Sequence, residues 1–141
     1  MQMENIIGRY QLVPLLFSQD ACADSQSAVA MNTVEATGVT LTATGYTIPW
    51  PYHVVGISVF SDSARTAGTL TVDASIDTVA TGLQAALDGT NTTYHYASQP
   101  RNTDIGAAGS RVGALLTTAS WTPVDADIAV LVFILVDLKG V

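Results

Sequence analysis

From Thr33 onward, apolar and polar residues alternate along much of the chain with a period of two. The clearest case is TLTVDASI, residues 69–76, in which Leu70, Val72, Ala74 and Ile76 alternate with polar side chains. Successive side chains of a strand point to opposite faces, so this pattern predicts a β-strand with one buried face. The same period marks five further segments, at residues 39–45, 53–59, 82–89, 92–98 and 111–118. In residues 53–59 it sets Val55, Ile57 and Val59 on one face.

Turn-forming residues separate these segments, at Thr44-Gly45, Ala67-Gly68, Asp88-Gly89 and residues 106–109. No amphipathic helix pattern lies between them. Many short strands at near-regular spacing are typical of an antiparallel sandwich, and the closest template is the jelly roll of two four-stranded sheets. We therefore expect an all-β, jelly-roll-like β-sandwich over residues 33–141, preceded by an N-terminal region over residues 1–32.

The N-terminal region allows two interpretations. Gly8–Phe17 is apolar enough to be the first strand of the sandwich, in which case Pro14 restricts it to a sheet edge or a strand end. It is equally suited to an extended arm that adds a strand to the sheet of a partner. Residues 18–32, rich in Ala and Ser, predict a loop, an extended linker or a short and weak helix.

The last apolar segment breaks the alternation. Nine apolar residues, Ile128 to Val136, lie between Asp127 and Asp137. A helix that crosses a bilayer needs about 20 apolar residues, so this segment is too short to span a membrane. As a strand it would have two apolar faces, of which the second consists of Ala129, Leu131, Phe133 and Leu135.

One face of a sandwich strand normally meets water and carries polar residues. Either loops or the N-terminal arm cover the second apolar face, or it packs against neighbouring subunits around a symmetry axis. We favour the second possibility and expect a homo-oligomer with its interface at Ala129, Leu131, Phe133 and Leu135.

Composition narrows the classes of function. The chain has 141 residues, enough for one domain with a proper core, and a net charge of −7. Its few basic residues are scattered, which argues against binding to nucleic acid. Cys22 is the single cysteine and cannot form an internal disulfide. The first 17 residues show no secretory signal, because Glu4, Gly8, Arg9 and Pro14 interrupt the apolar run.

The sequence offers little catalytic chemistry. His53 and His95 lie in no motif of a nucleophilic triad, and one cysteine with two histidines makes no zinc pattern. We expect His95 to be a surface or inter-sheet residue. Asp73, Asp77, Asp88 and Asp104 could meet at loop ends around calcium, an alternative that the sequence leaves open. We expect no enzymatic activity, no cofactor and no metal.

Exposed aromatic side chains raise the alternative of glycan binding. Trp50 stands between two prolines in IPWPYH, a rigid setting for presenting a ring, and Tyr52 follows closely. Tyr94, Tyr96 and Trp121 are further candidates. Each also has a structural interpretation, in which Trp50 caps the core and the indole of Trp121 packs under the end of the sandwich.

The order of motifs over residues 44–136 resembles a recurrent β-sandwich module of tailed-bacteriophage virions. The shared elements are GYTIP, VVGISV, ARTAGTLTV, LDGTNT, AAGSRVG and WTPVDAD. Modules of this kind occur in capsid decoration proteins and in head or tail fibres, and they are commonly trimeric without enzymatic activity. The resemblance covers about two-thirds of the chain and none of its first 43 residues.

The resemblance implies a structural virion protein. We expect a capsid decoration protein, a homotrimer that binds the major capsid protein on the outer surface of a phage head and stabilises the head. The expected capsid-contact residues belong to the N-terminal stretch: Ile7, Tyr10, Leu12, Val13, Leu15 and Phe17. The alternative is a receptor- or glycan-binding knob of a phage fibre, with contacts at Trp50 and Tyr52.

Overall fold

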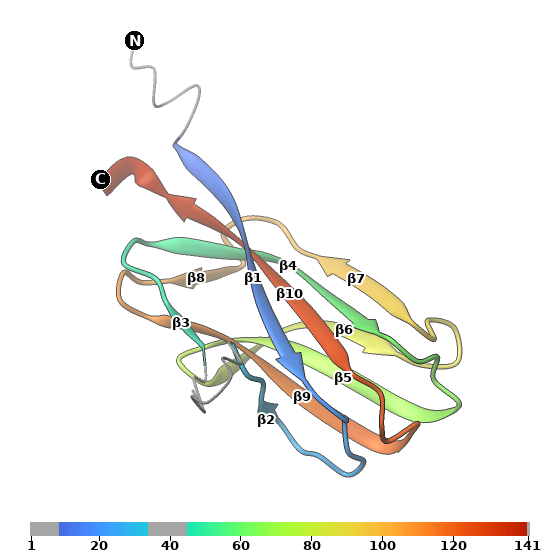
Figure 1. Cartoon of the computed structure of the whole chain (residues 1–141). Helices are drawn as coiled ribbons and strands as arrows, with labels where there is room; N and C mark the ends of the chain where they lie inside the picture. The colour runs from blue at the N-terminus through green and yellow to red at the C-terminus, as the bar shows by residue number, and fades with distance from the viewer. Residues whose placement is uncertain (1–8, 34–44, 141) are drawn as a thin grey trace.

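The computed structural model describes residues 9–33 and 45–140, which form two antiparallel sheets packed face to face (Figure 1). The first sheet has the order β1-β10-β4-β7, and the short β8 pairs with β4. Its strands are β1 (Tyr10–Gln19), β4 (Tyr52–Ser61), β7 (Tyr94–Ser98), β8 (Asp104–Gly106) and β10 (Ile128–Asp137). The predicted all-β antiparallel sandwich is confirmed.

The second sheet has the order β2-β9-β5-β6, and the short β3 pairs with β9. Its strands are β2 (Val29–Ala30), β3 (Tyr46–Thr47), β5 (Ala67–Ile76), β6 (Val79–Leu87) and β9 (Arg111–Thr122). A single turn of 3-10 helix, η2 (Leu138–Gly140), follows β10. Each sheet thus has the expected path of four strands, to which one short strand is added. The strand expected at residues 39–45 falls mostly outside the described residues.

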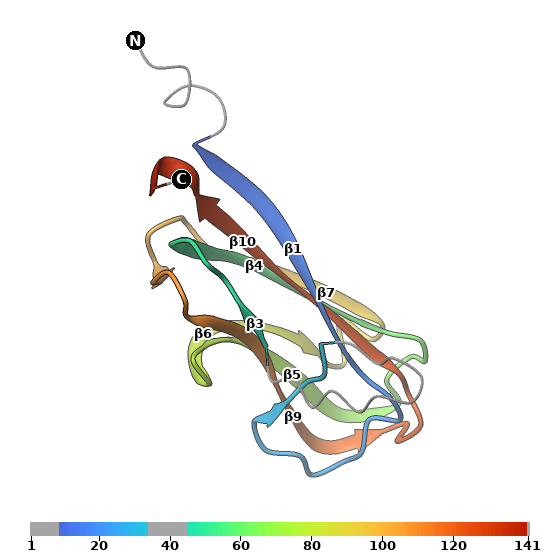
Figure 2. The ribbon, with the colours of Figure 1, turned by 60° about the vertical axis from the view of Figure 1, so that its left-hand side comes forward.

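Gly8–Phe17 corresponds to β1, which is a strand of the sandwich itself in its described part. It pairs along its whole length with β10, from Tyr10 opposite Asp137 to Gln19 opposite Ile128. Figure 2 shows the two strands side by side from a second direction. β1 lies at the edge of its sheet, and its Pro14, which has no N–H to donate, is compatible with that place.

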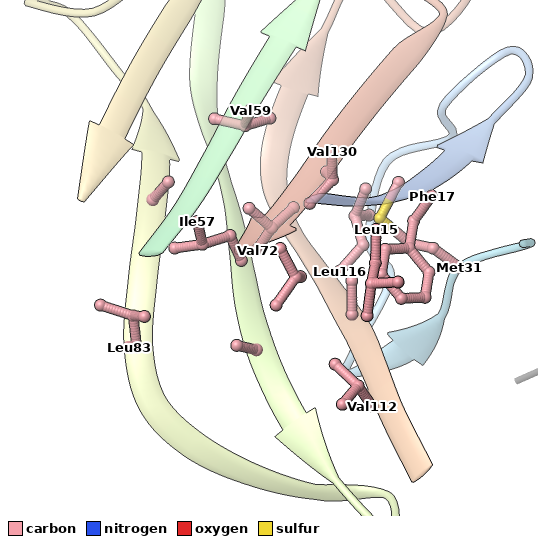
Figure 3. Packing of buried hydrophobic residues seen from close by; sticks show 14 of the residues in the cluster. Leu15, Phe17, Met31, Ile57, Val59, Val72, Leu83, Val112, Leu116 and Val130 are labelled. Carbon is pink, nitrogen blue, oxygen red and sulfur yellow. The ribbon is translucent and has the colours of Figure 1, made fainter. Parts of the chain in front are cut away.

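The core lies between the two sheets and follows the predicted alternation. Leu70, Val72 and Ala74 of β5 are buried, and so are the corresponding residues of β9 and β10. Figure 3 shows how side chains from both sheets interdigitate, among them Leu15, Phe17, Met31, Ile57, Val59, Leu83, Val112, Leu116 and Val130. Complete burial of such a side chain contributes about 1.5–3 kcal/mol each.

A β-bulge changes the expected faces of β4. The register between β10 and β4 shifts between Phe133 and Ile134, so Ile134 lies opposite Val54 and Val55 is left over. Val54 is fully buried and Val55 is only partly buried. The prediction that Val55 shares a face with Ile57 and Val59 is therefore wrong, because one extra residue in a strand reverses the alternation beyond it.

A tight two-residue turn joins β5 and β6. Ile76 pairs with Val79, and the intervening Asp77 and Thr78 have φ angles of 50° and 68°. Positive φ at both central positions matches the right-handed twist of the flanking strands. Asp77 also accepts a hydrogen bond from the backbone N–H of Arg111 at 2.9 Å, which ties the turn to the start of β9.

Residues 20–28 form a loop that closes one end of the sandwich. The Trp121 side chain is fully buried there, as the sequence predicted, and its backbone N–H donates to the carboxylate of Asp24 at 2.8 Å. Cys22 is buried as well, and burial raises the pKa of its thiol to about 11. The described part of residues 18–32 contains no helix, so of the three expected forms the loop, with the short β2, is the one observed.

Over residues 9–33 and 45–140 no helix is both long and apolar enough to cross a bilayer. The apolar run from Ile128 to Val136 forms most of β10, in the middle of the first sheet.

Candidate interaction surface

The outward side of the first sheet is rich in apolar side chains, and we call it the apolar face. β10 contributes Ala129, Leu131, Phe133 and Leu135, whose neighbours Ile128, Val130, Val132, Ile134 and Val136 fill the core. Strand register places the partners of these four on the same side. The apolar and aromatic ones are Leu12, Pro14 and Leu16 of β1, Phe60 of β4, Tyr94 and Tyr96 of β7, and Ile105 of β8, and Ser18, His53, Gly56, Ser58 and Ser98 lie among them.

Several of these side chains are open to solvent. The exposed fraction is 56% for Leu12, 51% for Leu16 and 58% for Ile105. The described loops therefore leave the apolar face uncovered at both sheet edges. The predicted interface residues Ala129, Leu131, Phe133 and Leu135 run along its centre and are partly buried by their neighbours.

An aromatic pair stands near the middle of the apolar face. The rings of Tyr96 and Phe133 meet edge to face, with centroids 5.9 Å apart. Gly56 lies beneath them, and a Cβ atom there would stand 3.0 Å from the Tyr96 hydroxyl and 3.3 Å from Phe133 Cδ2. The glycine thus leaves the space in which this pair packs.

One end of the apolar face carries positive charge, in a group that we call the Tyr10 corner: Arg9, Tyr10, His53 and Arg101. The guanidinium carbon of Arg9 lies 5.0 Å from the centroid of the Tyr10 ring and that of Arg101 lies 4.4 Å from it. The His53 ring meets the Tyr10 ring edge to face at 5.7 Å. Burial, followed by the nearby charge of Arg101, lowers the pKa of His53.

The opposite end of the apolar face is acidic. A cavity of about 250 Å³ opens there between the ends of β1, β4 and β10, lined by Phe60, Ala129 and three aspartates, Asp20, Asp62 and Asp127. Asp127 accepts a hydrogen bond from the Ala21 backbone N–H, and Asp62 accepts one from the Asp127 N–H. These two carboxylates hold the loop that follows β1 and the loop that precedes β10.

The predicted capsid-contact residues fall into different environments. Leu12 is exposed, whereas Tyr10 and Val13 are partly buried. Leu15 and Phe17 point into the core and have exposed fractions of 9% and 0%, so their side chains are not available to a partner in this fold. Ile7 lies outside the described residues. Alternation along β1 explains the division, because a paired strand must turn every second side chain inward.

The predicted glycan-contact pair is separated as well. Trp50 is 40% exposed, but Tyr52 is fully buried, and its hydroxyl hydrogen-bonds to the Ser110 hydroxyl at 2.8 Å. Burial raises the pKa of Tyr52. The prediction that Tyr52 contacts a glycan is therefore wrong. Tyr52 is the first residue of β4, and its ring packs inward against Gly106, so closely that a Cβ atom on Gly106 would collide with the ring.

The residues considered above for catalysis or for calcium binding have structural roles. His95 joins the two sheets, because its Nδ1 accepts a hydrogen bond from the Ala86 backbone N–H of β6 at 3.0 Å. This agrees with the predicted inter-sheet role. Asp73, Asp77, Asp88 and Asp104 each accept hydrogen bonds from nearby protein donors. The described residues contain no group of three His, Cys, Asp or Glu residues arranged to hold a metal ion.

Sequence reasoning missed part of the apolar face. Residues 10–17 carry the same signal as β10, since apolar residues occupy both alternating sets, with Leu12 and Leu16 on one side and Leu15 and Phe17 on the other. The contribution of Arg101 to the Tyr10 corner had no sequence signal. It reaches Tyr10 from the loop between β7 and β8, about ninety positions along the chain.

Comparison with known proteins identifies the fold. No protein-family model and no curated protein sequence matches the chain. The structure is similar to a chain of the cyanophage Pam1 capsid asymmetric unit, with a TM-score of 0.53, 13% identity, and coverage of 90% of this chain and 84% of that chain. It also matches the acid-stable capsid of Helicobacter pylori bacteriophage KHP30, with a TM-score of 0.49, 11% identity and coverage of 91% and 94%.

The globular domain of the zebrafish complement 1qA protein matches with a TM-score of 0.39, 12% identity and coverage of 86% of this chain and 94% of that chain. The two antiparallel sheets form the jelly-roll-like sandwich predicted from the sequence, and the fold is similar to that of a phage capsid chain. The expected resemblance to phage virion proteins is confirmed at the level of the fold, without a sequence family.

Proposed function

We propose that this chain is a structural virion protein without enzymatic activity, which decorates the outer surface of a phage head and stabilises it. The observation that carries the proposal is the apolar face, which a monomer would leave in water. The likeness of the fold to a phage capsid chain at a TM-score of 0.53 supports the choice of a virion as its location.

The apolar face is large enough for a subunit contact. β1, β4 and β10 have ten residues each, β7 has five and β8 has three, which at about 3.3 Å per residue and about 4.8 Å between strands gives an area of roughly 600 Å². Stable interfaces bury about 800 Å² on each partner, so the face would supply most of such a contact. In the proposed homotrimer the three apolar faces pack around the axis, with Ala129, Leu131, Phe133 and Leu135 nearest to it, and the end of each face at Tyr10 lies at the rim, where the capsid protein can reach it.

The N-terminal end of β1 is the proposed contact with the major capsid protein. Tyr10 and Leu12 remain as candidates in its described part, Val13 packs against the core with part of its surface left accessible, and Ile7 remains a prediction. Each trimer would hold three such contacts, and linked contacts bind far more tightly than a single one. A trimer that bridges neighbouring capsid subunits would add buried area at joints that the pressure of the packaged genome pulls apart.

Quantitative mass spectrometry of purified virions tests this function. A lattice-wide decoration protein predicts copy numbers comparable to those of the major capsid protein or a simple fraction of them. A few copies per particle would contradict decoration and favour the second candidate, a receptor- or glycan-binding knob of a fibre. The exposed rings of Tyr94 and Tyr96, at 56% and 48%, favour that candidate more than the buried Tyr52 does.

A further inference from the structure

The Tyr10 corner concentrates the few positive charges of an acidic chain. The sequence has five Lys and Arg residues against a net charge of −7. Two of the five, Arg9 and Arg101, flank the ring of Tyr10. Lys139 follows in η2, and the backbone N–H of Leu138 in that turn donates to the Arg9 carbonyl at 2.7 Å. This end of the molecule can therefore attract an anion although the whole chain would repel one.

The positive charge of the corner is only partly neutralised. Arg9 Nε and Asp137 Oδ1 are 3.5 Å apart and form an ion pair without hydrogen-bond geometry, so Arg9 Nε is buried with no acceptor among the described residues. Asp137 is also engaged by the backbone N–H of Lys139 at 3.0 Å. Arg101 forms no ion pair with any carboxylate that the structure describes, and the nearby Asp104 accepts instead from Gln99 at 2.8 Å.

His53 adds a second polar group without a partner. Its side chain is 7% exposed, and its Nδ1 has no hydrogen-bond partner in the described part of the chain. A buried polar atom of this kind costs free energy until something pairs with it. The lowered pKa of His53 has burial as its first cause, and the positive charges of Arg101 and Arg9 add to it. The local potential thus favours an anion over a further cation.

Apolar side chains stand next to these groups. Leu12, Leu135, His53 and Ile105 lie opposite one another in a single row across β1, β10, β4 and β8. Leu12 and Ile105, at the two ends of the row, are more than half exposed. A ligand that fits this row has a negative group that pairs with the guanidinium groups of Arg9 and Arg101. It also has apolar groups that contact Leu12 and Ile105. A peptide with an acidic residue between apolar ones has both.

We propose that the Tyr10 corner binds a carboxylate carried by an acidic peptide segment of the shell protein. The proposal rests on the proposed function for the identity of the partner. Arg101 and Arg9 donate to the carboxylate, and apolar side chains of the segment contact Leu12 and Ile105. Because Asp137 offsets Arg9, one guanidinium charge remains uncompensated, which suits a singly charged carboxylate better than a phosphate dianion.

The full chain can be tested directly with small probes. Nuclear magnetic resonance follows the side-chain signals of Tyr10 and His53 during titration with N-acetyl-Leu-Glu-Leu-amide, with the Gln analogue of that peptide, and with inorganic phosphate. Saturable shifts with the Glu peptide alone support the site. Equal shifts with the Gln peptide, no shifts with the Glu peptide, or tighter binding of phosphate overturn it.

Variants then assign the effect to the corner. Arg101→Gln is expected to weaken binding of the Glu peptide by at least about tenfold, and Arg101→Lys to weaken it less, because lysine keeps the charge and loses the planar fork. Arg111→Gln makes the same change of charge at an exposed position of the second sheet and is the matched control. An equal loss in Arg101→Gln and Arg111→Gln would overturn the assignment.

Binding to isolated heads separates this inference from the proposed function. A chain that binds the Glu peptide at the corner but does not bind heads contradicts the function and leaves the site standing. A chain that binds heads equally well with and without Arg101→Gln keeps the function and overturns the corner as the attachment site. A variant that changes self-association instead of head binding shows that a second copy occupies the corner, which overturns the choice of partner.

Discussion

The outward sides of the two sheets differ sharply although both sheets bury the same kind of side chain inward. On the second sheet the outward positions of β5 carry Thr69, Thr71 and Asp73, and their cross-strand partners include Thr117 and Gln84. On the first sheet the equivalent positions carry mostly leucine, isoleucine and aromatic residues, with a few serines among them. A sandwich needs only one apolar side per sheet. The second apolar side of the first sheet therefore calls for an explanation outside the monomer.

The largest expected effect comes from placing charge on the apolar face. The double variant Leu12→Asp and Leu16→Asp alters two exposed side chains of β1, so the monomer should keep its fold. Burying these carboxylates in a subunit contact is expected to weaken association by at least about 3 kcal/mol, or roughly a hundredfold. Sedimentation equilibrium measures the change.

The matched control for this variant is Thr69→Asp with Thr117→Asp, which makes the same two changes of charge on the polar side of the second sheet. Both of these threonines are exposed. Association should be unaffected there. Equal weakening by both pairs would show that the two outward sides do not differ in function.

A substitution of Asp73, on the polar side of the second sheet, is expected to lower stability and to leave association unchanged. Its carboxylate accepts hydrogen bonds from the Gly82 N–H at 3.0 Å and from Gln84 Nε2 at 2.6 Å. Asp73→Ala should lower the free energy of unfolding by about 1–2 kcal/mol and leave association unchanged. Urea denaturation of the variant, with Asp73→Asn as the milder control, measures the loss. A loss of association without a loss of stability would contradict the assignment.

A smaller effect is expected at Gly56, beneath the aromatic pair of the apolar face. A Cβ atom would force Tyr96 and Phe133 apart by a few tenths of an ångström. Gly56→Ala should reduce the free energy of unfolding by about 1 kcal/mol and weaken association, since the pair stands in the centre of the face. An unchanged association constant would indicate that the pair is not in the contact.

The smallest expected effect is on the pH dependence of stability, which reports the titration of His53. Its pKa is below the ordinary value of 6.5, so below that pH the unfolded chain takes up a proton that the folded chain resists. Stability should therefore fall as the pH decreases from 6.5 toward the folded pKa, and His53→Gln should remove part of this fall. Denaturation at about pH 7.5 and about pH 5 measures it, above the range in which aspartates titrate. An equal fall in the variant would assign the effect to other groups.

Local alternation was sufficient to predict most strands of this sandwich and most of its core. The sets Leu83, Ala85 and Leu87, and Val112, Ala114 and Leu116, are buried as expected. The same rule failed at Val55, because a bulge in a paired strand depends on its partner and leaves no trace in local periodicity. The short β8 was missed for a related reason, since three residues are too few to show a period.

The candidate surface was predicted only where one strand carries it. The two apolar faces of β10 predicted the apolar face, through residues such as Leu131 and Phe133. The Tyr10 corner had no such signal, because its residues come from three separate segments of the chain. Its residues meet only because β1 pairs with β10 and the loop before β8 folds back over them. The buried state of Tyr52 follows from similar causes, because Gly106 and Ser110 come from far along the chain.

The pairing of β1 with β10 has a consequence for biosynthesis. β1 leaves the ribosome before every other described strand, and its neighbour in the sheet, β10 (Ile128–Asp137), follows it far along the chain. At translation rates of about 5–20 residues per second, β1 waits on the order of ten seconds for that neighbour. During this interval both of its edges and its apolar side chains are unpaired. The nascent chain is thus exposed to aggregation and to chaperones until β10 has emerged, and the sheet closes only after that.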